Sequence, residues 1–201
     1  MALITAAEAR AFLPSNQGTA DDTLLDTLIA RCGAFFARHC GYPPASAGVA
    51  ATMETATYTR YLDGNGTRDL RLDVAPVQSV ASIYDDVDQD FAAATLVASG
   101  DYAITDANAA LIRLTSTAAH GQWNKSKGTI KATFVAGFST VPADVKQAAV
   151  LQVQHWYGLR GHGGKSSISV AGGGNAGLRE ETMPAAVRQL LSAYRMPSVL
   201  M

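Results

Sequence analysis

The chain has 201 residues, of which 48% are hydrophobic and 16% charged, so it can bury the core of one domain, or of one domain with an appendage. Its formal net charge of −1 excludes a general nucleic-acid binder, because proteins that track phosphates carry clustered positive charge. No apolar run reaches the length of a membrane span and two cysteines make no disulfide framework, so we expect a soluble protein made in a reducing cytoplasm.

Two helices are predicted in residues 1–50. Thr5 and Glu8 have the spacing of a capping box, which starts a short first helix. An aspartate pair ending at Asp22 favours the start of a longer second helix. Gly41 and the two prolines after it end that helix. Its apolar residues recur at the spacing of one helical face: Leu24, Leu25, Leu28, Ile29, Cys32, Phe35 and Phe36.

Residues 51–138 change to a period of two, which is typical of half-buried strands. The candidate strands are 55–62, 70–72, 77–84, 102–105, 111–114 and 129–135. An Asp-Gly-Asn-Gly turn at 63–66 stands between the first two. Short strands separated by Gly, Asp and Asn predict an antiparallel sheet or small barrel, not βαβ units.

The C-terminal third predicts two helices separated by a glycine-rich segment. Residues 139–160 form a long helix, because Pro142 suits a first turn and an apolar stripe follows it. Residues 161–183 are rich in glycine and predict a flexible arm. Residues 184–201 predict a docking helix, opened by Pro184, with an apolar tail. The stripe of the long helix contains Val145, Ala148, Ala149, Val153 and Trp156.

Together these elements predict an α+β fold. A helical bundle is built from the N- and C-terminal helices and carries an inserted antiparallel β-domain. The predicted parts are 1–50 (N-terminal helices), 51–138 (β-rich insert), 139–160 (long helix of the bundle), 161–183 (flexible arm) and 184–201 (docking helix and tail).

No catalytic, metal or cofactor motif is found, so we expect no enzyme. The glycines at 172–177 have the letters of a dinucleotide fingerprint, but too few residues follow for a Rossmann unit, and a glycine hinge is the better interpretation. The acidic stretch 86–90 begins like a calcium loop, yet Phe91 and Val97 stand where that loop needs Gly and Glu. A solvated hairpin tip is favoured there, with a weak cation site as the alternative.

Charge is distributed unevenly along the chain. Residues 63–106 carry a formal charge of −7 and residues 107–160 carry +5. This polarity predicts opposed charged surfaces, which serve where copies pack side by side or line a channel. The alternative is an acidic β-region that simply lies beside basic helices.

The C-terminal helix and tail are the candidate partner-binding surface. An apolar helix at the end of a glycine-rich tether is typical of a segment that docks onto another subunit, with hydrophobic burial supplying affinity. The alternative is that this helix folds back onto its own core. The candidate residues are Arg188, Leu190, Leu191, Tyr194, Arg195, Met196, Pro197, Val199 and Leu200, the arginines being available to pair with partner carboxylates.

Seven stretches share an order and spacing that extend over nearly the whole chain: 3–13 (LITAAEARAFL), 21–25 (DDTLL), 61–64 (YLDG), 72–80 (LDVAPVQSV), 134–138 (FVAGF), 141–148 (VPADVKQA) and 184–195 (PAAVRQLLSAYR). In this order they resemble the head–tail connector (adaptor) proteins of tailed bacteriophages. The glycine-rich stretch 161–177 is not carried over from that family.

The resemblance implies a structural virion protein at the head–tail interface, made in the host bacterial cytoplasm. It implies a homo-oligomeric ring, a dodecamer that matches the portal, extends the DNA channel and offers a platform to a tail-side stopper or tail terminator. Double-stranded DNA would pass without sequence-specific binding, and no cofactor, catalysis or membrane is involved. An infectious phage, a gene transfer agent and a prophage remnant stay open as settings.

Two further hypotheses accompany this interpretation. The candidate channel-facing residues are Asp85, Asp86, Asp88 and Asp90, whose negative charge would repel phosphates and let DNA slide. The alternative function is a small binding module whose β-domain recognises a ligand such as a sugar or a cation. Concentration-dependent ring formation separates the connector from that module.

Overall fold

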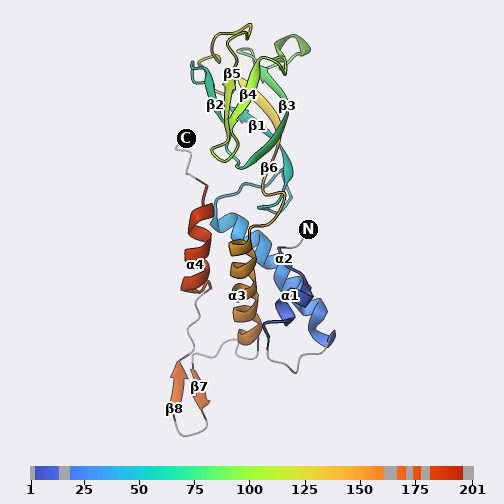
Figure 1. The fold of residues 1–201 in the computed structure, drawn as a ribbon, viewed down its shortest axis with the longest axis vertical. Coiled ribbons are helices and arrows are strands. Elements are labelled where there is room, and N and C mark those ends of the chain that lie inside the picture. The colour runs from blue at the N-terminus through green and yellow to red at the C-terminus, as the bar shows by residue number, and fades with distance from the viewer. Residues whose placement is uncertain (1–2, 14–18, 161–166, 171–173, 178–181, 197–201) are drawn as a thin grey trace. The chain divides into compact units, whose positions relative to one another are not determined.

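The computed structural model describes residues 3–13, 19–160, 167–170, 174–177 and 182–196 (Figure 1). The chain divides into two compact units. The helical unit comprises Met1–Phe36 and Val141–Arg195, and the β-unit comprises Ala37–Thr140 and Met196–Met201. The mixture of helices and antiparallel sheets confirms the α+β class.

Helix α1 (Ala6–Arg10) begins at the predicted capping box. The Glu8 N–H donates to the Thr5 hydroxyl, and the Thr5 N–H donates to the Glu8 carboxylate at 2.7 Å. The Thr5 N–H is the largest of the interactions that hold the pKa of Glu8 below its ordinary value. Local hydrogen bonding at the N-terminus of α1 is therefore sufficient to start this short helix.

Helix α2 (Asp22–His39) follows a single turn of 3₁₀ helix, Thr19–Asp21, and ends at the predicted glycine. Gly41 has a φ of +84°. Its N–H donates to the carbonyl of Arg38 at 3.1 Å, and the next N–H, of Tyr42, donates to Ala37 at 2.8 Å. This pair of bonds is a Schellman motif, in which glycine takes the left-handed conformation without strain.

Helices α3 (Ala143–Leu159) and α4 (Ala185–Leu191) each follow a proline at the N-cap, and α4 continues into a 3₁₀ turn, Ser192–Tyr194. Helix α4 lies alongside α3 (Figure 1). The buried core of the helical unit contains Leu25, Leu28, Ile29, Cys32, Phe36, Val145, Ala148, Ala149, Val153, Val187 and Leu191. Among the described residues, no helix is long and apolar enough to cross a membrane.

Three members of the predicted apolar faces, Leu24, Phe35 and Trp156, lie at the edge of this core. Leu24 is 38% exposed, and Trp156 is half-buried with its ring centroid 5.5 Å from that of Phe35. Gln152, which the apolar pattern passes over, is fully buried instead, and its side-chain amide donates to the carbonyl of Thr182 at 3.0 Å. This bond connects α3 to the residues just before α4.

The β-unit contains six described strands in two antiparallel sheets, one in the order β1-β6-β3 and the other in the order β2-β5-β4. The strands are β1 (Ala56–Leu62), β2 (Asp69–Arg71), β3 (Val77–Asp85), β4 (Tyr102–Asp106), β5 (Leu111–Leu114) and β6 (Ile130–Ala136). A short 3₁₀ turn, Ala93–Thr95, precedes β4. Each strand lies within about two residues of its predicted position.

The turn at 63–66 has the sequence of a hairpin turn, but the two strands on either side of it do not pair with each other. Strand β1 pairs with β6, and β2 pairs with β5 in the other sheet, so the turn joins two sheets instead of closing a hairpin. The Gly64 N–H donates to the carbonyl of Ser126 at 2.9 Å, and a Cβ on Gly64 would lie 1.7 Å from the carbonyl oxygen of Asn124. The turn is held by this distant segment, which a local pattern does not contain.

Each of the two sheets contributes buried side chains to the core of the β-unit. Tyr58, Ile83 and Phe134 of one sheet are fully buried, as are Ile112 and, to within a few per cent, Leu70 of the other. Because successive side chains of a strand point to opposite faces, the residues between these positions point outward. The β-unit therefore has two outer sheet surfaces, which are turned away from each other.

Residues 161–183 contain a paired β-hairpin that the sequence analysis does not predict. Strand β7 (Ser167–Val170) pairs antiparallel with β8 (Gly174–Gly177). The Ser-Ile-Ser-Val alternation has the period of a strand, but the surrounding glycines dominate the composition. The flexibility of this arm stays a prediction.

Candidate assembly surfaces

The C-terminal helix folds back onto its own unit, as the alternative interpretation has it. Leu191 is 0% exposed, so its place among surface docking residues is wrong in this conformation. Leu190 and Tyr194 are half-buried, whereas Arg188 and Arg195 are exposed. The apolar stripe of α4 is therefore divided between an inner edge that packs in the unit and an outer edge that a partner can contact.

Tyr194 also contributes to holding the end of this helix. Its hydroxyl donates to the Asp144 carboxylate at 3.4 Å. Partial burial, followed by the Asp144 charge, raises the pKa of Tyr194 above its ordinary value. This hydrogen bond connects the 3₁₀ turn after α4 to the first turn of α3.

The tail begins as part of the β-unit. The Met196 N–H donates to the carbonyl of Cys40 at 2.7 Å, and its Cβ lies close to Gly41. The half-buried Met196 lines a small hollow of about 20 Å³ beside Ala109 and Ala110. The other predicted tail contacts, Pro197, Val199 and Leu200, lie outside the described residues.

Three of the four candidate channel aspartates accept hydrogen bonds within the β-unit: Asp85, Asp86 and Asp90, the last from the N–H of Ala92 at 3.0 Å. Asp86 is only 5% exposed, which is a correction to its predicted position on a channel surface. Its carboxylate accepts the N–H groups of Asp88 at 2.9 Å and Phe91 at 2.8 Å. The pKa of Asp86 is held below its ordinary value, first by hydrogen bonding with the Asp90 side chain and then by these backbone donors. Burial acts in the opposite direction.

Asp85 is the second aspartate with an internal partner. It is half-buried, and its carboxylate accepts both the backbone and side-chain N–H groups of Asn124, at 3.1 and 3.0 Å. Asp88 and Asp90 are exposed, beside Val87 at 58% exposure. Only this tip of the loop presents charge and apolar surface to a partner.

An aromatic cluster, which the sequence analysis does not identify, adjoins the loop tip. Tyr61, Lys131 and Tyr84 form one row across β1, β6 and β3 on the outer surface of that sheet. The Lys131 ammonium lies 6.0 Å from the Tyr61 ring centroid and 5.6 Å from those of Tyr84 and Phe91. Tyr61 is 62% exposed, and its ring centroid lies 5.4 Å from that of Phe91.

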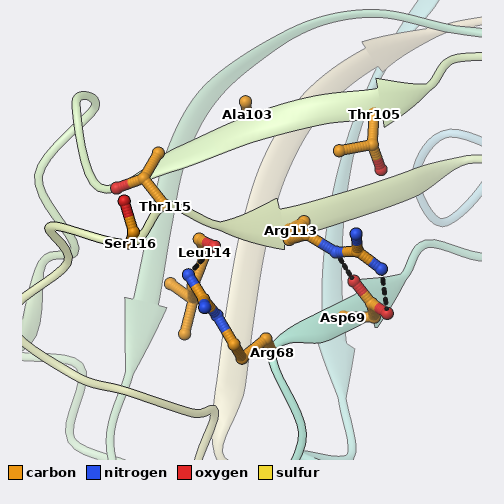
Figure 2. A pocket seen from close by; sticks show the side chains of 8 residues that line it. All are labelled: Arg68, Asp69, Ala103, Thr105, Arg113, Leu114, Thr115 and Ser116. Atoms are coloured by element: carbon orange, nitrogen blue, oxygen red, sulfur yellow. Dashed lines mark hydrogen bonds and ion pairs between the residues drawn. The ribbon is translucent and has the colours of Figure 1, made fainter.

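The outer surface of the other sheet contains an open pocket of about 450 Å³, here called the arginine pocket. Figure 2 shows its two guanidinium groups, those of Arg68, in the segment just before β2, and Arg113, on β5. Arg113 donates to both oxygens of Asp69, at 2.5 and 2.8 Å, while Arg68 donates to the carbonyl of Leu114 at 2.9 Å. The first pair lowers the pKa of Asp69.

The period of two could have identified these surfaces. It predicts that Tyr61 and Arg113 alternate with buried neighbours and so point outward. It cannot tell which strands are adjacent, and adjacency brings Lys131 between two tyrosines. Among the described residues, no group of three or more His, Cys, Asp or Glu side chains could hold a metal ion.

Comparison with known families decides what kind of protein carries these surfaces. A family model for head completion proteins matches residues 2–197. The chain belongs to the head completion protein family. The resemblance found in the sequence is confirmed at this level, and the family is a structural one of phage-like particles. No curated protein matches the chain.

Two solved structures have a similar fold. One is a chain from the neck of an empty GTA (gene transfer agent) particle computed with C6 symmetry, with a TM-score of 0.59 and 22% identity over 98% of this chain and 92% of that one. The other is from the neck of a native GTA particle computed with C12 symmetry, with a TM-score of 0.50 and 23% identity over 97% of this chain and 90% of that one. At this identity the likeness concerns the fold.

Proposed function

We propose that the chain forms a homo-oligomeric ring in the neck of a tailed phage or gene transfer agent particle, between the portal and the tail or stopper, where it extends the DNA channel. The observation that carries this proposal is the family match over residues 2–197. The shared fold with neck chains from particles computed with C6 and C12 symmetry supports a ring of identical copies. The helical unit would act as a bundle that carries the β-unit as an insert.

The mechanism is binding, not catalysis. The outer edge of α4, with Leu190, Tyr194 and the exposed arginines Arg188 and Arg195, docks onto the portal together with the tail that begins at Met196. Leu191 supports this edge from within the unit. Apolar contact supplies affinity, and the arginines select acidic partner side chains.

Quantitative mass spectrometry of purified particles from the source organism tests the function. A low, fixed copy number relative to the major capsid protein, equal to that of the portal, is the expected result. Absence from mature particles contradicts a neck role and favours the alternative, a ligand-binding β-module.

The docking edge needs point variants instead of a truncation. Removing residues after Thr182 would also remove the buried Val187 and Leu191, so loss of binding would report misfolding as well as docking. Exchanging both surface arginines, R188E/R195E, should abolish binding to isolated portal. The matched control is Arg31→Glu, an exposed arginine on α2. Equal portal binding by the double variant and the control contradicts the docking role.

The loop tip supplies the test of a DNA-facing role. Asp90→Asn removes an exposed charge, and the expected result is slower genome packaging or ejection because phosphates are repelled less. Asp26→Asn on α2 serves as the control. Unchanged packaging and ejection show that the charge belongs to an ordinary surface.

A further inference from the structure

The loop after β3 is built as a rigid, exposed knob. Val87 is 58% exposed and Asp88 lies beside it, while the loop is fixed from beneath by the buried Asp86 carboxylate. Gln89 and Phe91 have φ angles of +61° and +52°, a left-handed conformation that non-glycine residues adopt only where surrounding bonds require it. The Gln89 amide also donates to the Lys127 carbonyl at 2.9 Å.

The arginine pocket has the complementary form and charge. Its volume of about 450 Å³ lies within the range of about 300–1,000 Å³ of sites that hold small ligands, enough for a few side chains. The small side chains of Ala103 and Thr105 line it, and the Arg68 guanidinium, which also lines it, donates to the carbonyl of Leu114. Arginine recognises a carboxylate through two parallel hydrogen bonds.

We propose that the loop tip at Val87 and Asp88 of one copy inserts into the arginine pocket of the next copy, and that this contact joins neighbouring subunits of the ring. The inference rests on the proposed ring function and identifies its interface. Asp88 pairs with Arg68 of the neighbour, and Val87 fills the space above Ala103.

The placement of the two elements in the β-unit favours a ring over a closed dimer. The knob follows β3, at the edge of the sheet β1-β6-β3, and the pocket lies on the outer surface of the sheet β2-β5-β4. Two different complementary patches on one chain form a heterologous contact, which is repeated from copy to copy until a rotation closes the ring. A self-complementary patch would stop at two copies.

Charge supports the same pairing of knob and pocket. The loop tip from Asp86 to Asp90 contains three aspartates and no basic residue. Lys131, within the adjoining aromatic cluster, lies within 6.0 Å of three ring centroids. The pocket contains two arginines, Arg68 and Arg113, and one aspartate, Asp69, whose carboxylate is already paired with Arg113. A fixed knob loses little entropy on docking, so a small contact can suffice.

Sedimentation velocity of the full-length chain over a concentration series provides the test. We expect concentration-dependent association of the wild type, weakened about 30-fold by Asp88→Lys or by Arg68→Glu, since each leaves a charge without its partner. Ala103→Trp fills the pocket without changing any charge and should weaken association equally. Asp26→Lys and Arg31→Glu place the same charge changes on exposed positions of α2 and should have no effect.

Two combinations identify the head-to-tail geometry. The double variant D88K/R68E restores a reversed pair and should regain association. An equimolar mixture of Asp88→Lys with Ala103→Trp retains one good knob and one good pocket, so it should stop at a one-to-one dimer. Circular dichroism of each variant confirms that it is folded.

Association of Asp88→Lys and Ala103→Trp at wild-type strength, or a wild type that stays monomeric at its highest soluble concentration, overturns the proposal. The neck function is read separately, from particle copy number. A chain present in particles at the copy number of the portal, with variants that assemble normally, refutes this contact and leaves the neck function standing. Absence from particles refutes the neck function, while the variants still decide whether knob and pocket bind.

Discussion

The variant Leu191→Ala tests whether α4 packs against its own unit in the free chain or becomes buried only when a partner binds. Leu191 is 0% exposed on α4, and the substitution removes three carbon atoms from the interior. Transfer of those groups is worth about 2.4 kcal/mol, and the residual cavity brings the typical cost of a buried Leu→Ala change to about 3 kcal/mol or more. The neighbouring Leu190 is half-buried, so Leu190→Ala should cost about 1 kcal/mol or less.

Urea unfolding followed by far-UV circular dichroism measures both variants. The expected difference of about 2 kcal/mol between them corresponds to a Tm difference of roughly 4–8 °C for a chain of this size. Portal binding should show the opposite order, with Leu190→Ala the weaker binder among folded proteins. Equal stability losses at the two positions would refute the packing of α4 in the free chain and return Leu191 to the docking surface.

Three further outcomes follow from particular contacts. Asp86→Asn should lower the Tm. Because hydrogen bonds hold the folded pKa of Asp86 below 3.8, the contribution of this carboxylate to stability is full above about pH 4 and is lost as the pH falls further. A Tm series of the wild type and the variant from pH 6 to 2.5 measures this. Burial raises the pKa of Cys32 to about 12, and Cys40 is also buried. Neither thiol should therefore react with a thiol reagent at pH 8 until urea is added. Rapid labelling of the folded chain would contradict this prediction. Gly137→Ala should lower the free energy of unfolding, measured in urea, by about 2 kcal/mol or more. The reason is that Gly137 has a φ of +107° and the new Cβ would lie 2.3 Å from the Glu54 carbonyl oxygen. A loss under about 0.5 kcal/mol would show that the backbone relaxes to remove this close contact.

The sequence alone determined the elements whose physics is local. The capping box at Thr5 and the left-handed Gly41 use hydrogen bonds within a few residues, so short patterns contain the whole cause. Strand positions follow in the same way from alternation, because a buried sheet face selects every second side chain. Family membership was also visible, since it depends on the order of such segments.

Only the tertiary structure decided which segments meet. Strand β1 pairs with β6, more than sixty residues away, because their inner faces share one core. That pairing places Lys131 between tyrosines, and the turn after β3 buries Asp86 instead of exposing it. Whether Leu191 faces a partner or α3 depends likewise on a contact between distant segments. The alternation of one segment reports which side chains are buried, but not what covers them.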